Sequence, residues 1–270
     1  MFDQLGEGVY RRRYESLDLN VGVVLGEDGV LIVDTRSTHR EAAELIDDLG
    51  KLTRLPVRWV VNTHWHWDHV FGNALFTAAE IWGHELCIPA MESLGERMKQ
   101  DARRWMPPET HDDVDAVEVV APGHTFSESA TLAIGREVDL TYHGVAHTDA
   151  DIIVRVSEAG VAFFGDMIEE GAPPNFGDSH PEVWPETLRD AASEFPATAV
   201  PGHGDVVDET FVLAQIEELE TVADLAGAYA GGDDSALNRP GPYPADVMVS
   251  ALKRARYLRR SSGQGSRRQV

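Results

Sequence analysis

The sequence predicts an α/β fold of the α+β type: two β-sheets packed face to face with helices on both outer faces, a four-layer αββα sandwich. Short apolar strand patterns occur in two blocks, residues 21–83 and 130–200, and amphipathic helical patterns lie between and after them. A chain of 270 residues, 43% of them hydrophobic, is long enough to bury one sizeable core. We therefore expect one main domain over residues 1–235. A C-terminal helical extension with a basic tail, residues 236–270, should pack on this domain or trail from it.

The first block is predicted to begin with an antiparallel hairpin. Its apolar runs, residues 21–25 and 30–35, flank an Asp28-Gly29 pair that is typical of a hairpin turn. Ser37 or Thr38 is suited to cap a helix that runs to Leu49 and is closed by Gly50. Two further strands are expected at residues 57–62 and 80–83.

The rest of the chain alternates between helical and strand patterns. A helix over residues 85–104 should lead into a polar, Pro-containing connection at 107–115, which we interpret as a rim or lid loop. Further strands are expected at residues 130–134, 138–143, 151–156, 161–164 and 198–200, and further helices at 186–195, 208–230 and 245–260. The last ten residues, 261–270, are polar and predicted to be frayed.

Charge and composition exclude several classes of partner. The formal net charge is −23, and the last 18 residues hold seven Lys or Arg and no acid, so residues 1–252 carry a net −30. Such a body repels phosphate backbones, and we expect no nucleic-acid partner. The sequence has no apolar stretch of 18 residues and no signal-peptide pattern, which predicts a cytoplasmic protein without a membrane contact. A small-molecule substrate remains, and nothing in the sequence predicts an oligomeric state.

A group of histidines directly after a strand predicts a metal site. In Thr63-His64-Trp65-His66-Trp67-Asp68-His69, His64 and His66 point to the same side because side chains alternate along an extended chain, while Asp68 and His69 fall in the following turn. One short segment is therefore able to supply ligands to two adjacent metal ions. The only cysteine, Cys87, is at best a spare ligand, so His and carboxylate groups must hold the metals.

This segment resembles the HxHxDH signature of the metallo-β-lactamase superfamily, which also includes glyoxalase II thioesterases, lactonases and RNase Z nucleases. Three downstream positions resemble the remaining motifs of that family in the right order: His147 before a strand, and Asp166 and His203 at strand ends. The resemblance implies the four-layer metallo-β-lactamase fold. It also implies that His64, His66 and His147 hold one metal, that Asp68, His69 and His203 hold another, and that Asp166 bridges them. Asp34 is expected to support the metal ligands from behind.

The implied chemistry is hydrolysis. Two bridged ions would hold a hydroxide that attacks the carbonyl of a small ester, thioester, lactone or amide-like substrate. Zinc fits these ligands best, and iron or manganese is also suited to them. Asp68 is the best candidate to pass a proton, and is our candidate catalytic residue.

Three alternatives stay open. One is a mononuclear iron oxygenase acting on sulfur, similar to persulfide dioxygenases, which the complete second ligand set makes less favourable. β-Lactamase or phosphodiesterase activity is another, and a non-catalytic binding module on the same fold is the third. Substrate selectivity is expected to depend on loops, in particular residues 167–177, which directly follow Asp166.

Other conspicuous residues are interpreted as structural. Trp65, Trp67, Phe71 and Phe76 are expected to pack around the metal segment, and Trp105 is placed in the rim loop. The basic group Lys253, Arg254 and Arg256 is only loosely similar to the glutathione-binding helices of glyoxalase II enzymes, and we expect it on a solvated helix face.

Overall fold

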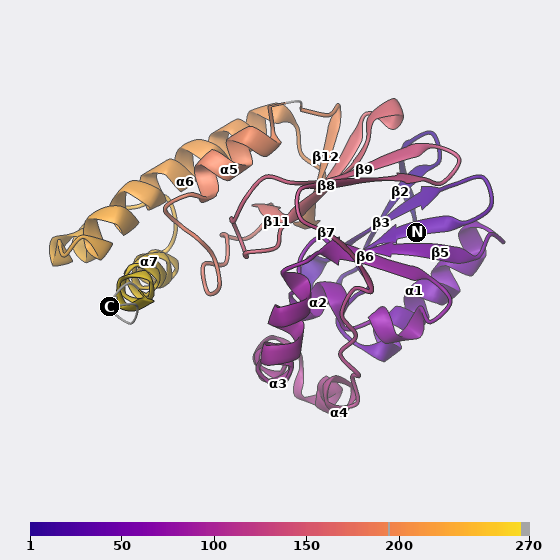
Figure 1. The fold of residues 1–270 in the computed structure, drawn as a ribbon, viewed down its shortest axis with the longest axis horizontal. Helices are drawn as coiled ribbons and strands as arrows, with labels where there is room; N and C mark the ends of the chain where they lie inside the picture. Colours follow the sequence, from indigo (N-terminus) through magenta and orange to yellow (C-terminus); the bar gives the residue numbers. More distant parts are fainter. Residues whose placement is uncertain (194, 266–270) are drawn as a thin grey trace.

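Two β-sheets lie face to face at the centre of the computed structural model, which describes residues 1–193 and 195–265 (Figure 1). The first sheet follows chain order: β1 (Asp3–Gly6), β2 (Val9–Arg13), β3 (Asn20–Leu25), β4 (Val30–Val33), β5 (Val57–Val61), β6 (Glu80–His84) and β7 (His124–Phe126). The second has the order β12 (Thr198–His203), β11 (Val161–Glu169), β10 (Ile152–Val156), β9 (Glu137–Tyr142) and β8 (Ser129–Ala133). In the first sheet, the successive strands from β4 through β7 pair in parallel, and in the second sheet β11 pairs in parallel with β12.

Strand alternation explains how each sheet buries both of its faces. In β4, Leu31 and Val33 point into the core between the sheets, whereas Val30 and Ile32 pack against a helix on the outer face. In the second sheet, Ile152 and Val154 of β10 point into the same inter-sheet core. The strand sequences therefore read as almost continuous apolar runs.

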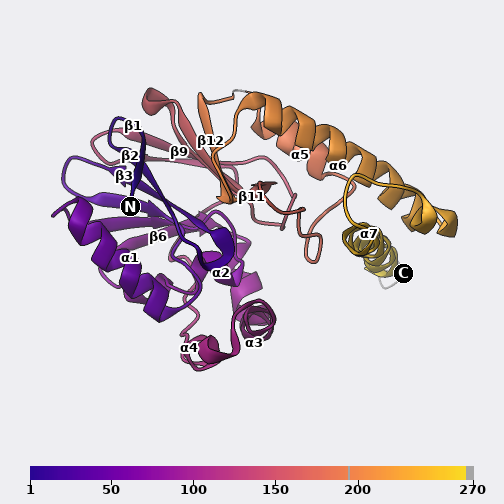
Figure 2. The ribbon, with the colours of Figure 1, turned by 180° about the vertical axis from the view of Figure 1, so that it is seen from behind.

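Helices cover the two outer faces, so the predicted four-layer sandwich is confirmed. The helices are α1 (His39–Leu52), α2 (Trp67–Val70), α3 (Cys87–Trp105), α4 (His111–Asp115), α5 (Trp184–Ala191), α6 (Glu209–Ala230) and α7 (Ala245–Gly265). Figures 1 and 2 show α1 to α4 on the side of the first sheet and α5 to α7 on the opposite side of the molecule. Buried residues of α5, α6 and α7 form one core with β11 and β12. None of the helices within residues 1–193 and 195–265 has the length and apolarity that a membrane span requires.

The structure corrects several predicted elements. Gly50 does not end α1, which continues to Leu52, and Thr38 rather than Ser37 is its N-cap, with a side chain that accepts a hydrogen bond from the Glu41 backbone N–H. β1, β2 and β7 were not predicted. The 107–115 connection is not a plain loop, because it contains a 3₁₀ turn and α4.

The C-terminal half also differs in places. Helix α5 begins at Trp184 and ends at Ala191, earlier than predicted at both ends. β11 continues past Asp166 to Glu169, so the segment after the aspartate begins as strand rather than loop. Helix α7 extends to Gly265, which corrects the expected fraying of residues 261–265, while residues 266–270 lie outside the described residues. The domain boundary at residue 235 stays a prediction, although Met248, Ala251 and Leu252 of α7 are buried in the main core.

Candidate metal centre

All seven predicted metal ligands lie together where strand ends of both sheets meet. His64 and His66 follow β5, and Asp68 and His69 belong to α2. His147 precedes β10, Asp166 lies within β11, and His203 ends β12. The potential ligand atoms form two groups, each with its atoms within 4.8 Å of one another: His64, His66, His147 and Asp166, and then Asp68, His69 and His203.

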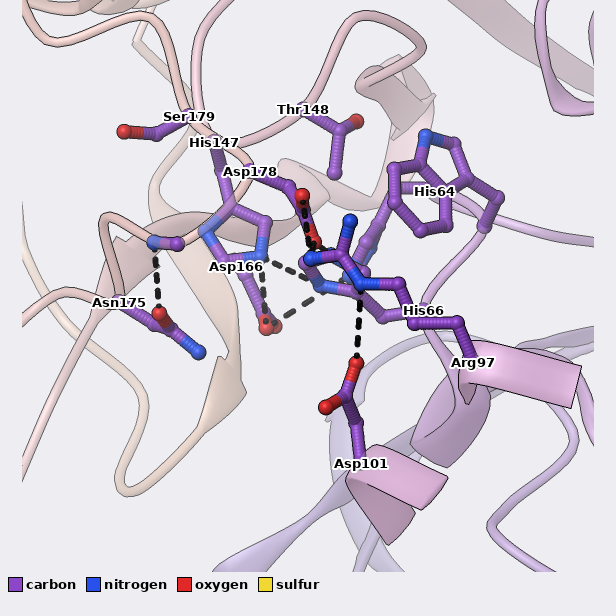
Figure 3. Close-up of polar contacts among 12 residues, drawn as sticks. His64, His66, Arg97, Asp101, His147, Thr148, Asp166, Asn175, Asp178 and Ser179 are labelled. Atoms are coloured by element: carbon purple, nitrogen blue, oxygen red, sulfur yellow. Dashed lines mark hydrogen bonds and ion pairs between the residues drawn. The ribbon is translucent and has the colours of Figure 1, made fainter. Parts of the chain in front are cut away.

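Asp166, a member of the first group, also approaches the second. Its Oδ2 is 3.6 Å from His64 Nε2 and 3.4 Å from His147 Nε2, on one side. On the other side, its Oδ1 is 3.2 Å from His69 Nε2 and its Oδ2 is 3.6 Å from His203 Nε2 (Figure 3 shows its contacts with the first group). This position agrees with the bridging role that the family resemblance implies.

Outer hydrogen bonds determine which nitrogen faces the centre in three of the five histidines. The Asp34 carboxylate accepts a hydrogen bond from His69 Nδ1 at 2.8 Å, and the Leu17 carbonyl accepts one from His203 Nδ1 at 2.7 Å. Thr63 donates its hydroxyl proton to Asp34, so its oxygen accepts from His64 Nδ1 at 3.1 Å. In all three rings Nδ1 is thereby engaged and Nε2 faces the cluster, which is the orientation that a metal ligand requires.

Burial and the neighbouring charges shift the pKa values of these groups in opposite directions. Burial lowers the pKa of His64 well below its usual value and that of His147 to about 3. Burial also opposes the charged form of His69, but the carboxylates of Asp166 and Asp34 outweigh it and raise its pKa. The cluster thus holds neutral imidazoles at His64 and His147 beside ionised carboxylates, and a bound cation would take the place of the proton that the carboxylates otherwise favour on His69.

Unpaired polar atoms show that the residues fit a metal. His64 Nε2 is buried without a hydrogen-bond partner among the described residues, and the buried His69 Nε2 and Asp166 Oδ1 contact only each other, at 3.2 Å and without good hydrogen-bond geometry. Leaving such atoms unpaired is costly unless a further group satisfies them. Because all of these atoms belong to the ligand cluster, one or more cations would satisfy them together.

A pocket of about 530 Å³ opens beside the cluster. Asp68, Asp166 and His203 form part of its floor, α3 contributes one wall, and the segment from Glu169 to Asp178 contributes the other. The 107–115 connection does not line this pocket, so its expected role as a rim is wrong. Trp105 does line it, but as the last residue of α3 rather than as part of that connection.

Several residues at the site were missed by the sequence analysis. Asp178 Oδ2 is 3.8 Å from His66 Nε2 and also pairs with Arg97 of α3. Burial opposes ionisation of Asp178, but the contact with His66 and the charges of Arg97 and Arg254 outweigh it and lower its pKa to about 2. Glu169 is buried at the pocket wall, and burial raises its pKa. Asp178 and Arg97 have no local motif, since only long-range packing brings them together, whereas Glu169 lies in the segment 167–177 that was expected to determine selectivity.

The remaining candidates have structural positions. Asp34 is buried behind the cluster, as expected, and Cys87 is buried in the core outside it. Trp65, Trp67, Phe71 and Phe76 are buried, and the first two also line the pocket. Arg254 and Arg256 are not on a solvated face, because both are partly buried and donate hydrogen bonds to backbone carbonyls.

Comparison with known proteins agrees with this geometry. The family model described as metallo-β-lactamase superfamily matches residues 17–203. A metallo-β-lactamase type 2 from Pseudomonas aeruginosa is 22% identical over 64% of this chain and 61% of its own length. A linear primary-alkylsulfatase from a Pseudomonas strain is 24% identical over 84% of this chain and 48% of its own length. The chain therefore spans about half to three fifths of these two relatives.

The fold also resembles solved structures. A metallo-β-lactamase from Pontibacter korlensis superposes with a TM-score of 0.66 at 19% identity, covering 82% of this chain and 98% of that chain. At this identity the likeness concerns the fold alone.

Proposed function

Since this chain belongs to the metallo-β-lactamase superfamily, we propose that it is a metal-dependent hydrolase with a dinuclear centre, of which zinc is the best-fitting metal. Its substrate would be a small ester, thioester, lactone or amide-like compound. The observation that carries the proposal is the convergence of seven ligand side chains, of which three histidines have their inward nitrogen set by an outer hydrogen bond. A purely structural cluster would have no need of inward atoms left unpaired.

The ligand division follows the two observed groups. His64, His66 and His147 would hold one ion, Asp68, His69 and His203 the other, and Asp166 would contact both. Bound ions of this kind polarise a carbonyl group and lower the pKa of water toward about 7.

Two further roles belong to the proposal, one for Asp68 and one for Asn175. Asp68 lines the pocket and lies 3.3 Å from His203 Nε2 through its Oδ2, so it is suited to take up a proton and to pass it to the leaving group. Asn175 also lines the pocket, and its Oδ1 accepts a hydrogen bond from the Gly177 backbone N–H at 2.9 Å (Figure 3). This bond leaves the Asn175 amide nitrogen as a donor toward negative charge that develops on a substrate oxygen.

The alternatives make different demands on the site. An iron oxygenase similar to persulfide dioxygenases would use only part of the ligand set, whereas the second group, Asp68, His69 and His203, is also assembled here. Because the relatives include a metallo-β-lactamase and an alkylsulfatase, β-lactams and sulfate esters also belong among the substrates to be tested. A non-catalytic binding module would tolerate loss of the ligands without loss of its role.

Elemental analysis combined with a hydrolysis screen tests the proposal. The purified protein should bind about two transition-metal ions per chain and cleave at least one ester, thioester, lactone, β-lactam, phosphodiester or alkyl sulfate. His203→Ala should retain about one ion and lose at least ~100-fold in kcat/KM. His124→Ala, which alters a histidine outside the cluster, is the control. Less than one ion per chain with no metal-restorable cleavage would reject the proposal, and oxygen uptake with a persulfide by the iron-loaded protein would favour the oxygenase.

A further inference from the structure

One wall of the pocket is an apolar stripe on α3. Leu94, Met98 and Trp105 follow one another at intervals of four and seven residues, which places them on the same face of the helix. Trp105 keeps 68% of its surface exposed although it lines the pocket, so its indole is available to a ligand. Trp65 and Trp67 add apolar surface beside the metal cluster.

The charged side chains that line the same pocket are mostly acidic. Outside the metal ligands they comprise five carboxylates and two guanidinium groups: Asp18, Asp101, Glu169, Glu170, Asp178, Arg97 and Arg104. The described lining residues include no lysine. Three of the carboxylates have arginine partners, because Asp18 pairs with Arg13, and Asp101 and Asp178 pair with the arginines of α3. Glu169 and Glu170 therefore remain as the described lining carboxylates without an arginine partner.

Both arginines already have acidic partners. Arg97 lies 2.9 Å from Asp178 through its Nη2 and 3.4 Å from Asp101 through its Nε, as Figure 3 shows. Arg104 Nη1 lies 2.5 Å from the other oxygen of Asp101. Among the described lining residues, neither guanidinium group is therefore left to pair with a substrate carboxylate, phosphate or sulfate.

We propose that this pocket selects a non-anionic substrate: a hydrophobic ester or thioester whose apolar group packs on the α3 stripe and whose remote end is neutral or, preferably, cationic. The inference deepens the proposed function and rests on it. The charge of bound metal ions acts on the reacting bond at the floor of the pocket, whereas the remote end meets the carboxylate of Glu170 and none of the free guanidinium or ammonium groups that an anion would need among the described lining residues. Carboxylates near a partly desolvated site attract a cation and repel an anion, and the exposed indole of Trp105 offers a cation–π contact.

Three butyryl thioesters of the same chain length test this selectivity on the zinc-loaded protein. Their thiols end in a trimethylammonium group, a neutral tert-butyl group or a carboxylate. We expect kcat/KM to be at least ~10-fold higher for the cationic than for the anionic ester, with the neutral ester between them. Tryptophan fluorescence with the matching ketone analogues, in which a methylene replaces the sulfur, measures binding without turnover and should give the same order.

A charge-matched pair of variants locates the effect. Asp101→Asn removes the carboxylate that pairs with Arg104 and one of the two carboxylates that pair with Arg97. The kcat/KM of the anionic ester should therefore rise about fivefold relative to that of the cationic one. Asp115→Asn is the control, since it removes the same charge and frees Arg103, another arginine of α3, but neither Arg103 nor Asp115 lines the pocket. Its selectivity should stay within about twofold of that of the unaltered protein.

The outcomes separate this inference from the proposed function. Efficient cleavage with the anionic ester equal to or better than the cationic one would overturn the inference and leave the hydrolase proposal standing. Selective binding of the cationic ketone without cleavage of any thioester would support the inference while counting against hydrolysis. If none of the ketones binds, or if both variants shift the selectivity equally, the inference is wrong.

Discussion

At the scale of single residues, the strictest requirement of the centre is the absence of a side chain at Gly202. A Cβ atom there would lie 1.9 Å from Asp166 Oδ1, far inside contact distance. Gly202 directly precedes His203, so β12 brings its backbone against the carboxylate that belongs to the first ligand group and also approaches the second. The position needs glycine for the close approach alone, because its φ is not in the left-handed region.

We therefore expect Gly202→Ala to displace the Asp166 carboxylate. The variant should bind fewer than about half as many metal ions as the unaltered protein and lose about 1–3 kcal/mol of unfolding free energy, the usual cost of overpacking. Metal analysis and urea unfolding measure both effects. Gly50→Ala is the matched control: nothing lies within 4 Å of a Cβ there, and it sits inside α1. It should raise stability by about 0.5–1 kcal/mol, and normal metal content in Gly202→Ala would disprove the argument.

Backbone strain is concentrated behind the same centre. The described residues other than glycine that have positive φ are Leu17 at 61°, Asp18 at 57°, Asp34 at 68° and Arg36 at 73°. The Leu17 carbonyl orients His203, and the Asp34 carboxylate orients His69. Such conformations cost of order 1–3 kcal/mol each and persist where the surrounding structure requires them. Here the strain accompanies the outer partners of the second ligand group.

At the scale of elements, α7 acts as a brace for the pocket wall, which means that it holds the backbone of residues 178 and 179 in place by hydrogen bonds. Arg254 Nε donates to the Ser179 carbonyl and its Nη2 to the Asp178 carbonyl, both at 2.8 Å. These bonds fix the backbone of the residue whose carboxylate approaches His66. The predicted C-terminal extension thus contacts the segment that shapes the site.

Arg254→Met keeps the apolar stem and removes both hydrogen bonds, so the segment 170–180 should exchange its amide hydrogens at least ~5-fold faster, since each lost bond is worth about 1 kcal/mol. Arg256→Met is the control on the same helix, because Arg256 instead donates to the Tyr229 carbonyl at the end of α6. It should accelerate exchange at that end and leave residues 170–180 unchanged. Equal protection of this segment in both variants would show that α7 is not its brace.

The elements also show what the sequence alone predicts and where it fails. The hairpin and the ligand motifs have local signals, such as the Asp28-Gly29 turn and the spacing of His64, His66, Asp68 and His69, and all of these lie where expected. β2 was missed because its sequence, VYRRR, carries three arginines, although Arg11 becomes buried when it pairs with Asp3 and Asp205. The pairing of Asp178 with Arg97 joins residues 81 positions apart. No local pattern encodes that contact.

At the scale of the whole molecule, the centre connects the two sheets. His64, His66, Asp68 and His69 come from the connection after β5 in the first sheet, whereas His147, Asp166 and His203 belong to the second. Each ligand group contains members from both sheets. Cations bound there would cross-link the two sheets. They would do so at the edge where the strand ends carry polar groups that repel one another or lack partners.

Metal binding should therefore stabilise the fold as a whole, because the unfolded chain does not hold the ligands together. With free zinc at about 100 times its dissociation constant, the free energy of unfolding should rise by about 2.7 kcal/mol per site over that of the chelated protein. Urea unfolding with a chelator, with zinc and with magnesium at the same ionic strength measures this difference, and magnesium is the control because His-rich sites bind it poorly. His203→Ala should keep only the part of the zinc effect that belongs to the first group. Equal midpoints with zinc and with chelator would mean that the seven side chains hold the two sheets together without a metal.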